Sequence, residues 1–313
     1  METVDIAIIG GGPAGLTAAL YAARARAKTV VCETGLPGGQ IVTTDWVENY
    51  PGFPEGISGA ELGELMHRQA AHFGAEFRTF ASIDSIEPAG IDFVITNSED
   101  EKFLAHAVIL ATGAVPRRLH VPGESEFTGR GVSWCATCDG ALFRDKAVAV
   151  IGGGDAAIEE ALFLTKFAAR VYVVHRRDAL RATKCIQERC FDSDKIELKW
   201  SRVVSEVKGA EGRVTGIQLA TTNGEPDEFL PLDGIFIFVG VEPKSELVRD
   251  LVELDENGYV KIDHNGLTSY PGLYAAGDVT VSDLKQVVTA AGGGAIAAFE
   301  ALRYIDERLC SVG

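Results

Sequence analysis

A glycine-rich turn occurs twice in this chain, at the same place in two similar stretches of sequence. The first turn is Gly10-Gly-Gly-Pro-Ala-Gly15 and the second is Gly152-Gly-Gly-Asp-Ala-Ala157. Each turn follows a short apolar run and precedes a helical pattern of small apolar residues. This order is typical of the βαβ unit that binds a dinucleotide, and two copies in register predict two such domains.

The runs around the turns fit strands. Residues 5–9 and 29–33 flank the first helical pattern, and residues 147–151 and 171–175 flank the second. Further apolar runs that end at or near a glycine lie at 108–113, 234–240 and 272–278. Since the last run comes after the second turn, the first domain is expected to be discontinuous and completed by the tail.

Turn-like sequence around Pro116, Pro122 and Pro243 predicts domain boundaries near 115 and 245. We therefore predict an α/β fold with two Rossmann-like (three-layer ββα) dinucleotide-binding domains. Residues 1–115 and 246–313 would form the first domain, and residues 116–245 would form the second, inserted into it.

Composition narrows the functional class. A chain of 313 residues is long enough for about two domains. A net charge of −16 argues against binding to nucleic acid or to anionic membranes, which require a basic surface. No apolar run approaches the ~20 residues of a membrane span, and the acidic N-terminus is unlike a signal peptide. We expect a cytoplasmic protein without a disulfide scaffold, because it has only six cysteines.

The first turn has the spacing of a nucleotide site. Gly10, Gly12 and Gly15 permit a tight turn, a close backbone approach to a pyrophosphate and close helix packing. Glu33, 18 residues after the last glycine, is placed to accept hydrogen bonds from ribose hydroxyls. A packing turn with a solvated glutamate is the alternative, and the combined spacing disfavours it.

The second turn differs at the residue that selects the cofactor. In place of an acid it has His175-Arg-Arg-Asp-Ala-Leu-Arg181, whose arginines suit a 2′-phosphate, so NADPH is favoured over NADH. A merely solvated basic face is the alternative. The predicted NADPH contacts are Gly152, Gly154, Asp155, Ala156, Ala157, His175, Arg176, Arg177 and Arg181.

Cys135-Ala-Thr-Cys138 is the predicted chemical centre. Two cysteines at this spacing can close a small disulfide, and the motif tends to produce a reactive thiolate. Asp139 follows directly and could move a proton. Half of a zinc site and an inert pair are the alternatives. The best second pair, Cys185 and Cys190, has poor zinc spacing, so we predict no metal.

Together these residues resemble the low-molecular-weight, bacterial-type thioredoxin reductases over almost the whole chain. Besides both turns and the CxxC segment, the markers are Gly38-Gly-Gln40, Glu48-Asn-Tyr-Pro-Gly52, Ala111-Thr-Gly113, Ala276-Gly-Asp278, Gln286 and Ala290-Ala-Gly292. An NADPH domain that carries Cys-Ala-Thr-Cys-Asp and interrupts an FAD domain is highly specific to this family.

The resemblance implies a homodimeric thioredoxin-disulfide reductase in which NADPH reduces FAD, FAD reduces the Cys135–Cys138 disulfide, and the dithiol reduces oxidised thioredoxin. Cys138 would be nearest the flavin, Cys135 would attack thioredoxin, Asp139 would act as acid and base, and the NADPH domain would rotate. The implied FAD contacts are Gly10, Gly12, Pro13, Ala14, Gly15, Glu33, Gly39, Gln40, Asn49, Ala111, Thr112, Gly113, Gly277, Asp278, Lys285, Gln286 and Val287.

The chain departs from the family pattern at two of these positions. Ala156 stands where the family often has Ser or Thr, and Lys285 stands where it often has Arg. An alternative is a flavoprotein of the same fold with another donor, ferredoxin or a deazaflavin, or another disulfide partner. The arginine cluster argues against another donor. A non-catalytic nucleotide-binding scaffold would not need the CxxC pair.

Overall fold

The structure, a computed structural model, describes residues 1–44, 47, 49–224, 226–282 and 284–311, and the side chains at 137–138 and 309–311 lie outside the described set. The chain divides into two compact units. Unit 1 comprises Met1–Val115 and Glu242–Gly313, and unit 2 comprises Pro116–Val241.

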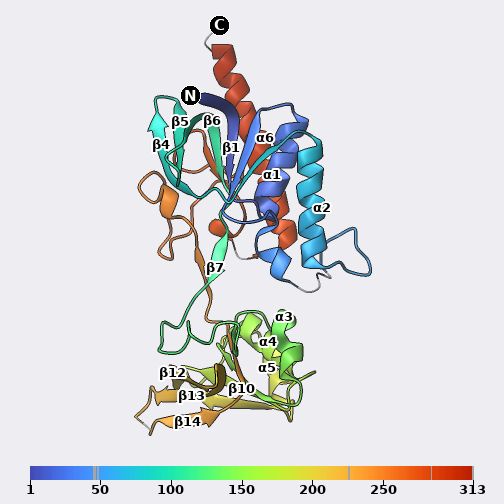
Figure 1. The fold of residues 1–313 in the computed structure, drawn as a ribbon, viewed down its shortest axis with the longest axis vertical. Coiled ribbons are helices and arrows are strands. Elements are labelled where there is room, and N and C mark those ends of the chain that lie inside the picture. Colours follow the sequence, from blue (N-terminus) through green and yellow to red (C-terminus); the bar gives the residue numbers. More distant parts are fainter. Residues whose placement is uncertain (45–46, 48, 225, 283, 312–313) are drawn as a thin grey trace. The chain divides into compact units, whose positions relative to one another are not determined.

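Unit 1 is built on a sheet whose described strands run in the order β3-β2-β1-β6-β5-β4, with β17 also paired to β6. Strands β1, β4, β5 and β6 of this sheet are labelled in Figure 1. The parallel strands are β1 (Glu2–Ile9), β2 (Thr29–Glu33), β3 (Glu76–Thr79), β6 (Lys102–Leu110) and β17 (Leu273–Ala275). The antiparallel strands are β4 (Ile83–Ala89) and β5 (Asp92–Asn97). The tail therefore contributes a strand to the first sheet.

Helices α1 (Pro13–Arg24), α2 (Gly59–His72) and α6 (Val287–Ser311) cover one face of this sheet (Figure 1). Small residues let α1 and α6 approach closely, since a Cβ at Gly294 would lie 2.0 Å from the Ala14 carbonyl oxygen. Residues around the short helix η3 (Glu246–Val248) pack with β4 and β5 over other core residues of the sheet. Helix η1 (Gly39–Thr43) and helix η4 (Gly277–Val279) lie in loops near the strand ends.

Unit 2 contains a second parallel sheet, in the order β11-β10-β9-β15-β8. Its strands are β8 (Val132–Ser133), β9 (Ala147–Ile151), β10 (Arg170–His175), β11 (Ile196–Trp200) and β15 (Gly234–Ile237). Apolar residues of α3 (Ala136–Asp139), η2 (Gly140–Phe143), α4 (Asp155–Leu164) and α5 (Lys184–Phe191) pack into one core. A second core lies under the antiparallel strands β12 (Arg202–Ala210), β13 (Arg213–Thr221) and β14 (Glu228–Pro231).

Both units thus have helices packed on a sheet with a core of parallel strands, which confirms the predicted α/β, Rossmann-like fold. The two connecting segments pair with each other as β7 (Ala114–Pro116) and β16 (Val241–Pro243). The second division of the chain falls within β16, whereas the sequence suggested residue 245. Which cofactor each unit binds stays a prediction.

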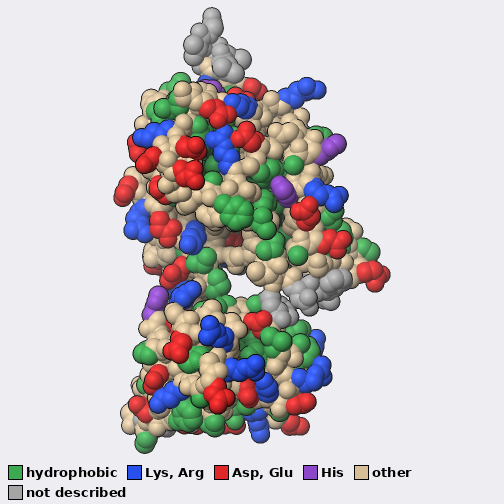
Figure 2. Space-filling model, viewed as in Figure 1, with side chains coloured by type: hydrophobic (Ala, Val, Ile, Leu, Met, Phe, Trp, Pro, Cys, Tyr) green, Lys and Arg blue, Asp and Glu red, His purple; other side chains and the backbone are tan. Residues whose placement is uncertain are grey.

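Acidic and basic side chains are interspersed on both units over the face shown in Figure 2. None of the helices in the described ranges combines the length and the apolar character that a membrane span requires. Among the described side chains, no group of three or more His, Cys, Asp and Glu residues is arranged to hold a metal ion.

Candidate active site

The first glycine turn joins β1 to α1 at the carboxyl end of the sheet. Gly10 has φ +107°, and a Cβ there would lie 2.4 Å from the Ala111 carbonyl oxygen, so only glycine fits. Gly12 is the N-cap of α1 in an extended conformation, and no side chain caps the helix. The first N–H groups of α1 are therefore free of side-chain caps, as a phosphate site requires.

Glu33 ends β2 directly beside this turn. Its Oε2 accepts a hydrogen bond from the Gly11 N–H at 2.7 Å, and its Oε1 accepts one from the Gly35 N–H at 3.0 Å. These two backbone donors fix the carboxylate against the middle glycine. The predicted pairing of turn and acid is thus formed in space, and part of the acid's hydrogen-bonding capacity is already used.

Three other predicted flavin residues bond to parts of unit 1 that are distant in sequence. Gln40 donates from its amide to the Ala114 carbonyl, which ties η1 to β7. The Asn49 amide donates to Gln286 Oε1 at 2.9 Å, so the structure brings together two residues far apart in the chain. The Thr112 hydroxyl donates to the Lys244 carbonyl at 2.5 Å.

Lys285 directs its ammonium group toward its own loop. Its Nζ donates to the carbonyls of Asp278 and Thr280 at 3.1 and 3.3 Å, and it lies 4.0 Å from the centroid of the Tyr259 ring. Burial lowers the pKa of Lys285, and the nearby Asp278 partly offsets this. Two carbonyls and an aromatic ring therefore hold the ammonium in the loop before α6, and its assignment to the flavin stays a prediction.

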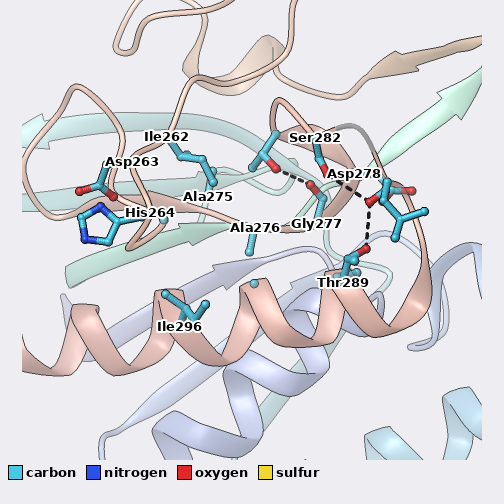
Figure 3. A pocket seen from close by; sticks show the side chains of 15 residues that line it. Ile262, Asp263, His264, Ala275, Ala276, Gly277, Asp278, Ser282, Thr289 and Ile296 are labelled. Atoms are coloured by element: carbon cyan, nitrogen blue, oxygen red, sulfur yellow. Dashed lines mark hydrogen bonds between the residues drawn. The ribbon is translucent and has the colours of Figure 1, made fainter. Parts of the chain in front are cut away.

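Asp278 lies in η4, beside a cavity of about 250 Å³ (Figure 3). Burial raises the pKa of its carboxyl, and the Lys285 ammonium partly offsets the rise. In Figure 3, Thr289 and Ile296 of α6 line the cavity opposite Ala275–Gly277. Gly277 has φ +77°, and a Cβ there would lie 2.9 Å from the Ala14 Cβ, so this segment packs tightly against the start of α1.

The second glycine turn joins β9 to α4 and repeats the geometry of the first. Gly152 has φ +154°, and a Cβ there would lie 2.4 Å from the Phe238 carbonyl oxygen. Gly154 is the N-cap of α4, again extended and without a side-chain cap. Asp155 directs a carboxylate oxygen away from α4, because its Oδ1 accepts the Thr183 N–H at 2.6 Å.

Arg176, Arg177 and Arg181 are exposed and form no ion pair within the part of the chain that the structure describes. The Arg181 Nη2 lies 3.9 Å from where a Cβ at Gly154 would be. These cations are available to an anion at the second turn. His175, by contrast, is buried: a Cβ at Gly153 would come 2.4 Å from its Nδ1.

Burial is the main cause that lowers the pKa of His175, and the Arg181 charge lowers it further. The imidazole is therefore neutral at pH 7 and packs behind the turn. The sequence placed it among the NADPH contacts, and that assignment stays a prediction.

Cys135 is disulfide-bonded and immediately precedes α3 in unit 2. The side chain of Cys138 lies outside the described residues, so the predicted pairing is not described. Cys32, Cys185 and Cys190 are free. The Asp139 N–H donates to the Cys135 carbonyl at 3.2 Å, which closes one helical turn over the CxxC segment.

The chain is similar to known proteins over nearly its whole length. Residues 4–294 match the family model described as pyridine nucleotide-disulphide oxidoreductase. The thioredoxin reductase of Peptoclostridium litorale is 49% identical over 98% of this chain and 99% of its own, and that of Bacillus subtilis is 44% identical over 97% and 95%. A crystal structure of Lactococcus lactis thioredoxin reductase matches with TM-score 0.86 and 43% identity, covering 97% of this chain and 99% of that one.

The chain belongs to the thioredoxin reductase family. It is an oxidoreductase, and membership in the family implies that it binds a flavin and a pyridine nucleotide. The described residues fit both groups. A Cβ at Gly12 or Gly154 would occupy the open space at the start of its helix, and each helix has N–H groups without a side-chain cap. The three unpaired arginines of this thioredoxin reductase fit a further phosphate at the second turn.

Two residues that support the reductase site were not predicted from the sequence. The Ser133 hydroxyl accepts the Cys135 N–H at 3.0 Å and donates to the Cys135 carbonyl at 3.3 Å, so it fixes the start of the CxxC segment. A serine three residues before a helix start is a local signal that could have found it. Tyr259, whose ring faces Lys285, had no such signal, because that contact is long-range.

Proposed function

We propose that this protein is an NADPH-dependent thioredoxin-disulfide reductase that uses FAD and the Cys135–Cys138 dithiol. The observation that carries the proposal is that one unit holds both the disulfide-bonded Cys135 and a glycine turn flanked by unpaired arginines. A pyridine-nucleotide site and a redox-active cysteine on one body are what electron delivery to a partner disulfide requires.

FAD is assigned to unit 1. Its pyrophosphate would bind the uncapped N–H groups of α1 beside Gly12, and a ribose would bind Glu33. Asn49, Gln286 and Asp278 would complete the site from loops near the same strand ends. The full set of flavin contacts inferred from the family resemblance is carried forward here as part of the proposal.

NADPH is assigned to unit 2. Its pyrophosphate would bind at the N-terminus of α4, and its 2′-phosphate would bind among Arg176, Arg177 and Arg181. Ala156 is exposed in the first turn of α4 and offers no hydroxyl. When bound, the two cofactors supply the two-electron donor and carrier that disulfide reduction needs.

The dithiol chemistry is assigned to Cys135 and Cys138. In the reduced protein the Cys135 thiolate attacks one sulfur of the thioredoxin disulfide, and the other sulfur leaves as a thiolate. The Cys138 thiolate then attacks the Cys135 sulfur, which restores the Cys135–Cys138 disulfide and releases thioredoxin as a dithiol. Two electrons pass to thioredoxin, and Asp139 donates and accepts the accompanying protons.

We further propose that the protein is a cytoplasmic homodimer that pairs through α1 and α6. The outer surface of these helices exposes Tyr21, Val288, Ile296 and Phe299, at 45, 41, 45 and 57% of their areas. A cavity of about 360 Å³ lies beside Tyr21 and Val288 and is lined mainly by residues of α1, α2 and α6. An apolar surface of this kind usually marks an interface. Ile296→Glu would shift the sedimentation coefficient to that of a monomer, whereas a wild-type monomer would contradict the dimer.

The decisive experiment is an anaerobic titration of the purified protein with NADPH, followed by flavin absorbance. We expect bleaching and uptake of reducing equivalents for both the flavin and one disulfide. A flavin that stays oxidised would instead favour the alternative donors, ferredoxin or a deazaflavin. A purified protein that holds flavin but no reducible disulfide would favour a scaffold.

Variants separate the thiol roles. Cys138→Ser is expected to retain NADPH-dependent flavin reduction and to lose thioredoxin reduction. Cys185→Ser is the matched control, because Cys185 is an exposed free thiol on α5, and it should keep both activities. Full thioredoxin turnover by Cys138→Ser would refute the assignment.

A further inference from the structure

The loop at 176–183, which carries the three arginines, is fastened to the second glycine turn by three consecutive backbone N–H groups. The Arg181 and Ala182 N–H groups donate to the Gly153 carbonyl at 2.7 and 3.1 Å. The next N–H, from Thr183, donates to Asp155 Oδ1 at 2.6 Å. The loop is thereby held on the turn at the point where its last arginine occurs.

Of the acceptors in these three bonds to the turn, only that from Asp155 is a side chain, and the Gln187 amide separately donates to the Ala182 carbonyl of the loop at 2.6 Å. Asp155 is the first residue of α4, and the residue that it holds, Thr183, is the N-cap of α5. The Thr183 side chain makes no capping hydrogen bond within α5. The carboxylate therefore links the starts of two helices through a short, charge-assisted bond at the protein surface.

We infer that Asp155 is a positioning residue that sets the preference for NADPH over NADH by holding Arg181 beside the turn. The inference rests on the proposed NADPH site. Arg181 Nη2 lies 3.9 Å from the position of a Cβ at Gly154, two residues along the loop from the bond to Asp155. Loosening Thr183 would cost affinity only for a nucleotide whose 2′-phosphate needs that arginine.

Two other roles for Asp155 predict different outcomes. If its carboxylate bound the nucleotide directly, its removal would lower the affinity for nucleotides with and without a 2′-phosphate alike. If it acted only as a negative charge near the pyrophosphate, its removal would raise the affinity for both kinds of nucleotide. A positioning role alone predicts a loss confined to the 2′-phosphorylated nucleotide.

The test uses two redox-inert probes, 2′,5′-ADP and 5′-AMP, titrated calorimetrically into the full-length protein. We expect Asp155→Ala to lower the affinity for 2′,5′-ADP by about tenfold, which corresponds to the loss of one charge-assisted hydrogen bond. The affinity for 5′-AMP should not change. Asp155→Asn keeps an acceptor oxygen without the charge and should restore most of the affinity for 2′,5′-ADP. Equal changes for both probes, or no rescue by Asp155→Asn, would overturn the inference.

A second variant removes the donor. Thr183 has φ −61°, which proline adopts, so Thr183→Pro deletes the N–H while keeping that dihedral. It should lose the same affinity for 2′,5′-ADP, and the double variant should lose no more than either single one. Additive losses would overturn the inference, and Thr183→Pro decides alone if Asp155→Ala does not fold.

The same measurements separate this inference from the proposed function. A wild-type protein with no preference for 2′,5′-ADP over 5′-AMP would overturn both. A wild-type preference that Asp155→Ala retains would overturn only the positioning role.

Discussion

The two glycine turns have the same backbone arrangement but differ in the side chain that packs behind the middle glycine. In each turn the carbonyl of that glycine accepts an N–H from the loop after the second strand at 2.7 Å: Gly11 from Gly38, and Gly153 from Arg181. Behind Gly11 stands Glu33, which hydrogen-bonds to the turn, and behind Gly153 stands the buried ring of His175. The backbone thus builds two turns of the same form, and under the proposed function the side chains outside each turn would set which nucleotide binds there.

The last position of the turn offers the strongest test of this equivalence. Gly15 in unit 1 corresponds to Ala157 in unit 2, and a Cβ at Gly15 would lie 1.9 Å from the Gly10 carbonyl oxygen. Gly15→Ala should therefore destabilise unit 1 by about 3 kcal/mol and lose flavin. Ala157→Gly, the reverse change, should cost unit 2 only about 1 kcal/mol.

Thermal unfolding and the flavin-to-protein absorbance ratio measure both effects. If Gly15→Ala melts at the wild-type temperature and keeps its flavin, the first turn tolerates a methyl group as well as the second. The proposed difference between the two turns at this position would then be wrong. Gly52→Ala is a control for a glycine with positive φ and nothing within 4 Å of its Cβ position.

What the sequence could predict here was local. Gly10 and Gly152 follow apolar strands and precede small-residue helices, so spacing alone located both turns and the strand ends that follow. The spacing also pointed to His175 as a ligand-side residue, but its ring is buried against Gly153. That contact joins β10 to the β9–α4 turn, and no periodicity within either segment encodes it.

The loops show the same limit. Lys285 reads as a cation near the flavin, yet its ammonium bonds to the carbonyls of Asp278 and Thr280 and faces Tyr259. Asp155 reads as a nucleotide contact, yet an oxygen of its carboxylate bonds to Thr183. In both cases the residue type was informative, but its partner depends on how distant loops pack together.

The second prediction concerns the residue directly before Glu33 in unit 1 and the residue directly before His175 in unit 2. Cys32 in β2 corresponds to Val174 in β10, and burial raises the pKa of the Cys32 thiol to about 11. Between pH 9 and 11 the unfolded chain releases this proton and the folded chain keeps it, so stability falls as pH rises. The loss should reach about 2 to 3 kcal/mol at pH 11.

Cys32→Val, which copies unit 2, should remove that alkaline loss. Urea unfolding at pH 8 and at pH 10.5 measures it, with Cys185→Ser as a control at an exposed thiol. Identical alkaline losses in Cys32→Val and the wild type would show that Cys32 is not the source.

A smaller effect is expected at Glu33 itself. Glu33→Gln keeps one acceptor oxygen but presents an amide N–H₂ group to one of the two backbone donors, Gly11 or Gly35. Unit 1 should lose about 1 to 2 kcal/mol, measured by urea unfolding at pH 7. Glu126→Gln, at an exposed position, is the matched control. An equal stability for Glu33→Gln and the wild type would mean that the acid does not stabilise the first turn.

The smallest effect, absent at neutral pH, belongs to His175. Because burial and Arg181 lower its pKa, the unfolded chain binds a proton below about pH 6.5 that the folded chain does not yet bind. Stability from this group is therefore complete above that pH and decreases as pH falls. His175→Asn, which keeps a polar side chain that does not titrate, should unfold at the same midpoint at pH 5.5 and pH 7.5, after correction with exposed His120→Asn. Unit 1 has no histidine at the corresponding position, so acid should lower the stability of unit 2 and alkali that of unit 1. A loss of stability in acid that persists in His175→Asn would contradict this difference between the turns.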